Sequence, residues 1–240
     1  MRKFIIAMMM ICMTGAAYPQ VFIDCAVKGY LGTTWLINEN IFKNTDYVHK
    51  ISAGGGGGAK LGFNFNDNYE LAGEAIYFNF NQNFTISEND RNWEKHIKIN
   101  TIDFPILFRH NKDNGSYLEV GTQYTMLKQA TETGISGKIE DGADNFDKSY
   151  WSAVLGFGGY MMGWENFGIS LGFRVVYSFA DIVSGGQAVA GTYKNAVADV
   201  PSYKPTNPLT AGLVLEFNYD LGYMAKSPCT GRRQFLFFTN

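Results

Sequence analysis

The chain has 240 residues, of which 18% are charged and 15% are aromatic, and its formal net charge at pH 7 is −2. This low charge density and high aromatic content are unusual for a water-soluble domain. The small negative charge argues against a nucleic-acid-binding surface, since such surfaces are strongly basic.

The N-terminal segment 1–17 is predicted to be a signal peptide. Two basic residues at positions 2–3 precede the apolar stretch 4–13, and three small residues at 15–17 follow it. Such a stretch is too short to cross a bilayer as a helix, and this order of charged, apolar and small residues is typical of a secretory leader cleaved after Ala17. The alternative is a buried N-terminal strand or helix.

The rest of the chain is dominated by period-2 alternation of apolar and polar residues, which predicts β-strands. No other apolar run approaches the roughly 18 residues that a membrane-spanning helix requires. Taken in chain order, the predicted strands are 21–35, 50–65, 69–81, 96–109, 117–127, 150–162, 167–179 and 209–221.

Two of these strands contain residues that weaken a sheet. The glycine run 54–58 predicts a sharply bent or closely packed wall segment. It does not fit a phosphate-binding loop, because no helix with a Lys–Ser/Thr pair follows it. Pro105 has no backbone N–H to donate, so it predicts a bulge or locally weak pairing.

The predicted connections alternate between short and long. Short turns at one rim and long loops at the other are typical of transmembrane β-barrels. The sequence therefore predicts an all-β fold, an eight-stranded antiparallel up-and-down transmembrane β-barrel over residues 18–221, with both ends on the periplasmic side. The short turns are 66–68, 110–115 and 163–166, and the long loops are 36–49, 82–95, 128–148 and 181–207.

The two faces of the predicted strands differ in composition. One face is rich in aromatic and large aliphatic residues, with Tyr and Trp near strand ends, and is predicted to face lipid. The other carries Gly, Ser, Thr and isolated charges, which suits the narrow interior of a small barrel. A soluble β-barrel or sandwich is the alternative, but its exterior would be rich in Lys and Glu.

The charged residues of the polar face are the candidate lumen residues. Unpaired charges inside so narrow a barrel would be costly, so we expect them to pair across the lumen and plug it. The alternative is a proton- or ion-conducting path. The expected pairs join Lys28, Lys60, Arg109 and Arg174 with Glu74, Asp103, Glu119 and Glu216, and three further carboxylates on this face are Asp24, Glu70 and Asp220.

Four consecutive predicted strands carry a resemblance to a known family. Residues 102–108 (IDFPILF), followed by 117–121 (YLEVG), resemble the core of the PorT-like outer-membrane β-barrel family. Residues 71–77 (LAGEAIY) and the Gly-rich strand 57–65 are also similar to it. The resemblance covers most of residues 20–221. It implies a membrane β-barrel, and some members of the family serve protein secretion of the type IX kind.

The last predicted strand resembles the signal that barrel-assembly machinery reads. Thr210, Gly212, Leu215 and Phe217 match its polar, glycine, apolar and aromatic positions. This implies that the machinery is a partner during biogenesis and that 222–240 is a periplasmic C-terminal tail. The tail would pair as an extra strand, dock under the barrel or bind a periplasmic partner.

Two cysteines remain after the predicted cleavage site. Cys25 lies near the start of the first predicted strand and Cys229 lies just beyond the last one. In an oxidising compartment they would either form a disulfide or remain apart.

No pattern in the sequence indicates an enzyme, a cofactor or a metal site. A rim-located hydrolase or acyltransferase would need a Ser–His pair, and the spacing of His49 and His96 from Ser52 and Ser87 is not diagnostic of one. The acidic run 141–147 lacks EF-hand spacing, so a solvated loop is expected there rather than a Ca²⁺ site.

The sequence thus predicts a protein in the outer membrane of a Gram-negative-type bacterium. We expect a structural or interaction role with a closed lumen and no enzymatic activity. The expected partners are outer-membrane lipid, the barrel-assembly machinery, and a periplasmic or extracellular protein. The alternatives are a small-solute or ion channel and a soluble β-barrel binding protein.

Overall fold

The computed structural model describes most of the predicted barrel. The predicted signal peptide lies outside the described residues, as do Cys229, its suggested disulfide, and all but the first two residues of the predicted tail. The described ranges are 22–43, 47–65, 67–88, 91–133, 139–141, 143–164, 166–183 and 204–223.

The described residues form ten strands and two short helices. None of the described helices is long and apolar enough to cross a membrane. The elements are β1 (Phe22–Asn38), α2 (Glu39–Lys43), β2 (Tyr47–Lys50), β3 (Ser52–Asn64), β4 (Tyr69–Glu88), β5 (Arg91–Asn111), β6 (Ser116–Thr133), β7 (Ile139–Asp141), η1 (Ala143–Asn145), β8 (Ser149–Trp164), β9 (Phe167–Ser178) and β10 (Thr206–Tyr223).

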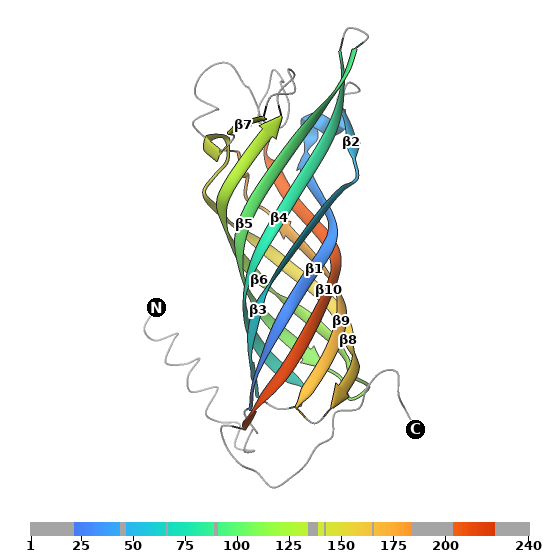
Figure 1. Ribbon diagram of the computed structural model, residues 1–240, viewed down its shortest axis with the longest axis vertical. Coiled ribbons are helices and arrows are strands. Elements are labelled where there is room, and N and C mark those ends of the chain that lie inside the picture. The colour runs from blue at the N-terminus through green and yellow to red at the C-terminus, as the bar shows by residue number, and fades with distance from the viewer. Residues whose placement is uncertain are drawn as a thin grey trace.

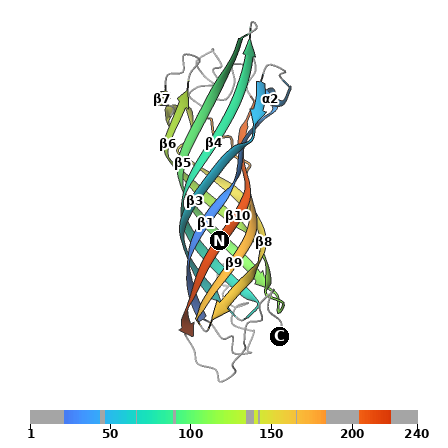
Figure 2. The same ribbon diagram turned by 45° about the vertical axis from the view of Figure 1, so that its right-hand side comes forward.

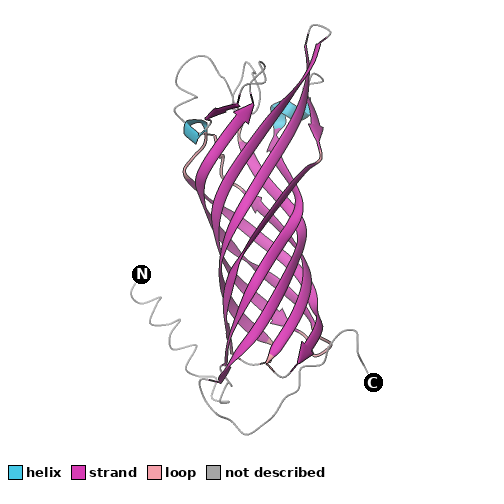
Figure 3. Cartoon of the chain, in the orientation of Figure 1, coloured by secondary structure: helices cyan, strands magenta, loops and turns pink. Residues whose placement is uncertain are grey.

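The long strands pair antiparallel with their neighbours and close into a barrel (Figure 1). The first and last strands pair along their whole length, from Phe22↔Tyr223 to Asn38↔Thr206. The cycle of pairings runs β1-β3-β4-β5-β6-β8-β9-β10 and returns to β1. Figures 2 and 3 show the strands tilted around one common axis. Closure leaves no long strand with an unpaired edge.

The predicted set of eight strands omitted two short strands. The described sheet has ten strands, of which β2 pairs only with β4 and β7 pairs only with β6. Both short strands lie in segments predicted to be loops, 36–49 for nearly all of β2 and 128–148 for β7. Strands of four and three residues are too short for alternation to reveal.

The predicted loop 82–95 was also wrong, because β4 and β5 continue through most of it. Their ladder extends as far as Glu88↔Arg91, and Figure 1 shows this hairpin reaching beyond the other strands. The polarity of the two faces reverses along the hairpin. Phe84 and Ile97 are buried on the inner face of the hairpin, whereas Lys98 is exposed on its outer face. At the far part of the hairpin the outer face is therefore polar, unlike the apolar outer face of the rest of the barrel.

The short connections lie at the opposite end of the barrel from this projection. They join β3 to β4, β5 to β6, and β8 to β9. The first residues of β1 and the last residues of β10 lie at the same end of the barrel (Figure 1). The β5–β6 turn closes with a hydrogen bond from the Gly115 N–H to the Lys112 carbonyl oxygen at 2.9 Å. Gly115 has a φ of 80°, which favours glycine. The predicted short-turn rim is therefore observed.

The two unusual sequence features have local structural counterparts. The β4–β5 ladder passes from Gly73↔Ile106 to Ile76↔Asp103 and omits Pro105, which confirms the predicted weak pairing. In the glycine run, a Cβ on Gly58 would collide with a backbone carbonyl oxygen of β4. This part of the wall is closely packed.

Candidate functional site

Charged side chains from seven strands meet inside the barrel and form what we call the charge network. All point inward because they occupy alternate positions on their strands. None is more than 6% exposed. Its members are Asp24 and Lys28 on β1, Lys60 on β3, Glu70 and Glu74 on β4, Arg109 on β5, Glu119 on β6, Arg174 on β9 and Glu216 on β10.

Arg174 joins two carboxylates across the lumen. Its Nη1 and Nη2 donate to the two oxygens of Glu74 at 2.7 and 3.0 Å. Its Nε donates to Oε1 of Glu119 at 2.8 Å. The bidentate arrangement uses the planar guanidinium fork and fixes the position of both carboxylates.

Arg109 makes a second set of bonds beside the first. Its Nη1 and Nη2 donate to the oxygens of Glu216 at 3.0 and 2.9 Å. Its Nη2 also donates to Oε2 of Glu119 at 3.0 Å. The guanidinium lies 4.2 Å from the centre of the Tyr117 ring, a cation–π distance. Glu119 therefore links the two arginines.

The two lysines complete the charge network. Lys28 Nζ lies 2.5 Å from Glu74 Oε1 and 2.7 Å from Glu216 Oε2. Lys60 Nζ lies 2.6 Å from Glu70 and 2.9 Å from Glu216. A weaker contact at 3.3 Å joins Lys60 to the carboxylate of Asp24. Each of the four cations therefore contacts at least two carboxylates.

The structure brings together seven of the eight residues expected to pair and leaves Asp103 apart. No described Lys or Arg forms an ion pair with Asp103, so that expected pairing was wrong. It lies further along the lumen, beside the hydroxyls of Thr101 and Thr125. Alternation identified its face correctly but carries no information on its height in the barrel. Asp220, also assigned to this face, is only partly buried near the end of β10.

An apolar cluster fills the lumen above the charge network, and the sequence analysis did not predict it. Phe78 and Phe84 of β4 and Leu36 of β1 belong to it. Phe146 and Ile182, from two long connections, are each 2% exposed and pack onto the same cluster. The sequence does carry a signal for this cluster. In β4, apolar residues such as Phe80 occupy the inward positions, while the adjacent outward position holds Asn81.

The two connections that bear Phe146 and Ile182 are tied to each other. The Asp147 N–H donates to the Ile182 carbonyl oxygen at 2.7 Å, and Phe146 forms an isolated bridge with Val183. Burial, together with the nearby carboxylate of Asp181, raises the pKa of Asp147 above its ordinary value. This tie holds the apolar cluster closed from above.

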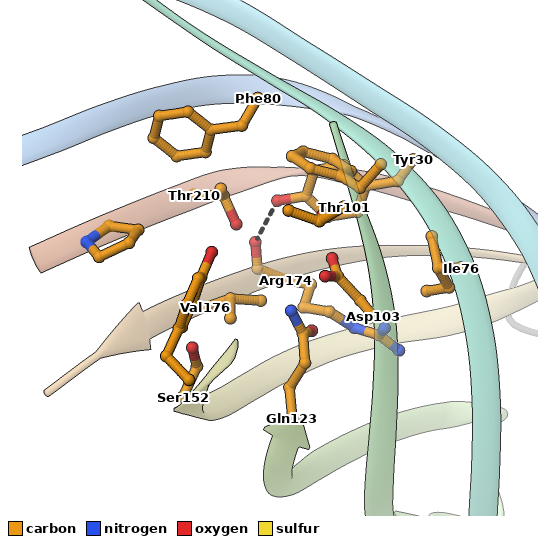
Figure 4. A pocket seen from close by; sticks show the side chains of 13 residues that line it. Tyr30, Ile76, Phe80, Thr101, Asp103, Gln123, Ser152, Arg174, Val176 and Thr210 are labelled. Carbon is orange, nitrogen blue, oxygen red and sulfur yellow. Dashed lines mark hydrogen bonds between the residues drawn. The ribbon is translucent and has the colours of Figure 1, made fainter. Parts of the chain in front are cut away.

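A small cavity separates the charge network from the apolar cluster. Its volume is about 40 Å³. In Figure 4 the side chains of Asp103, Gln123 and Tyr30 surround it, and a hydrogen bond of 3.3 Å joins the Tyr30 hydroxyl to the Arg174 carbonyl oxygen. The lumen thus has three levels, which are charged, mixed and apolar.

The outer face of the barrel carries the large apolar side chains. Val27, Leu155 and Leu213 are each more than half exposed on the outside. Their inward neighbours Lys28 and Val154 are almost fully buried. The apolar exterior and polar interior are opposite to the arrangement of a soluble barrel.

The histidines and serines considered for catalysis are not joined in the described part of the chain. Both ring nitrogens of His49 lack a hydrogen-bond partner among the described residues. His96 Nδ1 instead contacts Asn83 Oδ1 at 2.7 Å, and the Ser52 hydroxyl donates to the Lys50 carbonyl oxygen at 3.0 Å. The side chain of Ser87 lies outside the described residues.

The match to a protein-family model agrees with this architecture. The model of the family described as outer membrane protein beta-barrel domain matches residues 4–217, so the chain belongs to that family. No curated protein matches the chain.

Several solved outer-membrane proteins are similar to the chain at low sequence identity. OprG from Pseudomonas aeruginosa has a TM-score of 0.43 and 12% identity, covering 85% of this chain and 97% of that one. Neisserial surface protein A has a TM-score of 0.41 and 10% identity, covering 81% and 95%. Ail of Yersinia pestis has a TM-score of 0.40 and 11% identity, covering 82% and 98%.

Proposed function

We propose that this protein is a sealed outer-membrane β-barrel with a structural or interaction role, and that it binds partners through its long connections and its tail. The charge network is the observation that carries this proposal. A solute crossing the lumen would have to part ion pairs such as Arg174–Glu74 at 2.7 Å. Each charge left buried without a partner raises the barrier steeply.

The proposed location is the outer membrane of a Gram-negative-type bacterium, reached through the leader 1–17. Membership of the barrel family supports it, as does the exposed apolar outer face, whose proposed partner is lipid. Mass measurement of the mature chain from isolated membranes would test the leader. Cleavage after Ala17 is expected, and an intact N-terminus would contradict it.

Within the barrel family we propose a PorT-like assignment with a link to protein secretion. The segments that carry the resemblance lie on β3, β4, β5 and β6, which are successive neighbours in the sheet. Their glutamates, Glu74 and Glu119, are both members of the charge network. Deletion of the gene is expected to deplete secreted proteins from the medium, and an unchanged set of secreted proteins would reject the link.

We further propose that the barrel-assembly machinery inserts the chain by reading β10. Two of the signal positions, Leu215 and Phe217, point outward and are exposed, where a partner can contact them. No catalytic role is proposed, because the described hydrogen bonds of Ser52 and His96 do not join the two residues.

Planar-bilayer recording tests the sealed lumen. Wild-type protein is expected to give no steady conductance. The variant Arg174→Ala with Arg109→Ala removes the two guanidinium groups that span the lumen and is expected to conduct. Lys43→Ala, which breaks an exposed ion pair with Glu39, is the control and should stay silent. Steady wild-type conductance would overturn the proposal in favour of a channel.

A further inference from the structure

The cavity between the charge network and the apolar cluster has the features of a cation site. The Asp103 side chain lines it, and the residue is only 6% exposed. Its Oδ1 has no hydrogen-bond partner among the described residues. A buried carboxylate oxygen in this situation is costly unless a hydrogen-bond donor or a cation completes its environment.

The charge balance of the lumen favours an additional cation. The charge network contains five carboxylates and four cationic side chains. Asp103 lies outside the network and adds a further acidic group to the lumen. The four cationic side chains are already held by network carboxylates. A bound cation would therefore meet an excess of negative charge.

The walls of the cavity select the kind of cation. Tyr30, Phe78, Phe80 and Tyr150 supply aromatic rings. Side-chain oxygens also come from Thr101, Gln123, Ser152 and Thr210. Arg174 lines the cavity too, but its guanidinium is held by Glu74 and Glu119 of the charge network. Hard metal ions such as Ca²⁺ and Mg²⁺ favour sites with several charged or carbonyl oxygen ligands, and Asp103 is the one carboxylate among the described residues that line the cavity. Aromatic rings and one carboxylate are instead the groups that recognise ammonium cations.

The size of the cavity limits the ligand further. One water-sized guest needs roughly 10–15 Å³ on the same measure, so about 40 Å³ holds only a few heavy atoms. Ammonium and methylammonium fit this limit, whereas tetramethylammonium does not. We propose that this cavity binds a small ammonium cation, either ammonium itself or methylammonium, through the free carboxylate oxygen of Asp103.

Buried side chains flank this site on two sides. The charge network lies below it, and Phe146 and Ile182 pack above it on the apolar cluster. We therefore expect slow exchange with the solvent, so binding must be measured after long equilibration. The proposal does not depend on whether the lumen conducts, because it concerns occupancy at equilibrium.

The test is equilibrium dialysis of the full chain in detergent micelles against isotope-labelled methylammonium chloride, left overnight to reach equilibrium. Wild type is expected to bind it saturably, and Asp103→Asn is expected to bind at least tenfold more weakly. Asp113→Asn, the same change on an exposed turn, is the matched control and should bind like wild type. Equal binding by Asp103→Asn, or no saturable binding by wild type, would overturn the proposal.

A second measurement needs only wild-type protein and decides the question even if Asp103→Asn does not fold. Tetramethylammonium chloride and sodium chloride at equal concentration replace methylammonium. Neither is expected to produce saturable binding, since the first exceeds the cavity and the second lacks N–H donors for the Asp103 oxygen. Binding of tetramethylammonium as tight as that of methylammonium would place the ligand elsewhere and refute the proposal. An infrared band of a protonated carboxyl group that disappears in Asp103→Asn and is unaffected by methylammonium would also refute it.

Discussion

Replacing Arg174 with methionine should destabilise the barrel severely. The change removes three hydrogen bonds of 2.7 to 3.0 Å to Glu74 and Glu119. Each carboxylate keeps one other cation, Lys28 at 2.5 Å for Glu74 and Arg109 at 3.0 Å for Glu119. Removing one partner of a buried ion pair costs about 3–5 kcal/mol. Because both carboxylates retain a cation, we expect about 3 kcal/mol, roughly a 100-fold change in the folding equilibrium.

A second change should recover part of this loss. Adding Glu119→Gln to Arg174→Met removes the negative charge that the arginine had balanced, and replacement of both members of a buried pair is often close to neutral. Lys43→Met serves as the control, because the pair it forms with Glu39 is exposed and such pairs contribute about 1 kcal/mol or less.

Equilibrium unfolding by urea in lipid vesicles, followed by tryptophan fluorescence, measures these free energies. The reasoning predicts a large loss for Arg174→Met, partial recovery in the double variant and little change for Lys43→Met. A loss under about 1 kcal/mol for Arg174→Met would show that the charge network does not hold the barrel together.

Three further predictions concern the wall, the lipid face and the loops. Gly58→Ala should reduce assembly into the heat-modifiable form on gels, because the added Cβ would collide with the β4 backbone. Gly29→Ala is the control and should assemble normally, because the space around its Cβ is open. Equal yields of the two variants would contradict the packing argument. Leu155→Lys should cost about 2–4 kcal/mol in vesicle unfolding if it faces the middle of the bilayer, and a neutral effect would argue against lipid contact. For Asp147, the raised pKa means that the folded form holds its proton more tightly, so the loop tie should strengthen as pH falls through that pKa and weaken as pH rises. Hydrogen exchange of the amide of residue 147, corrected for intrinsic rates, should show this trend, and Asp147→Asn should remove it. A trend that persists in Asp147→Asn would show that the Asp147 carboxyl group is not its cause.

Much of the wall could be predicted from the sequence because the side chains of a strand alternate strictly between two faces. That period placed Lys28, Arg174 and Glu216 inside the lumen, and it placed Leu213 and Leu215 outside. Pairing between charges followed from the cost of burying them alone. These predictions need only the alternation of side chains along each strand and the narrow width of an eight-stranded barrel.

The features that could not be predicted depend on the position of a residue along the barrel axis. Alternation assigns Asp103 to the same face as Arg109 but does not show that its level lacks a cation. The β4–β5 hairpin reverses its polarity where it leaves the apolar belt, so Phe84 faces inward and Lys98 outward. Burial of Phe146 and Ile182 depends on contacts between distant connections, which no local pattern reports.

We expect the apolar outer face to lie in lipid and the β4–β5 hairpin to project into water. Single-cysteine variants at Leu155 and Lys98, both on the outer face, would carry a fluorescent label in vesicles that contain brominated lipid. The account predicts that brominated lipid quenches the label at position 155 and aqueous iodide quenches the label at position 98. Iodide quenching of both labels, without quenching by lipid, would contradict it and indicate a soluble barrel.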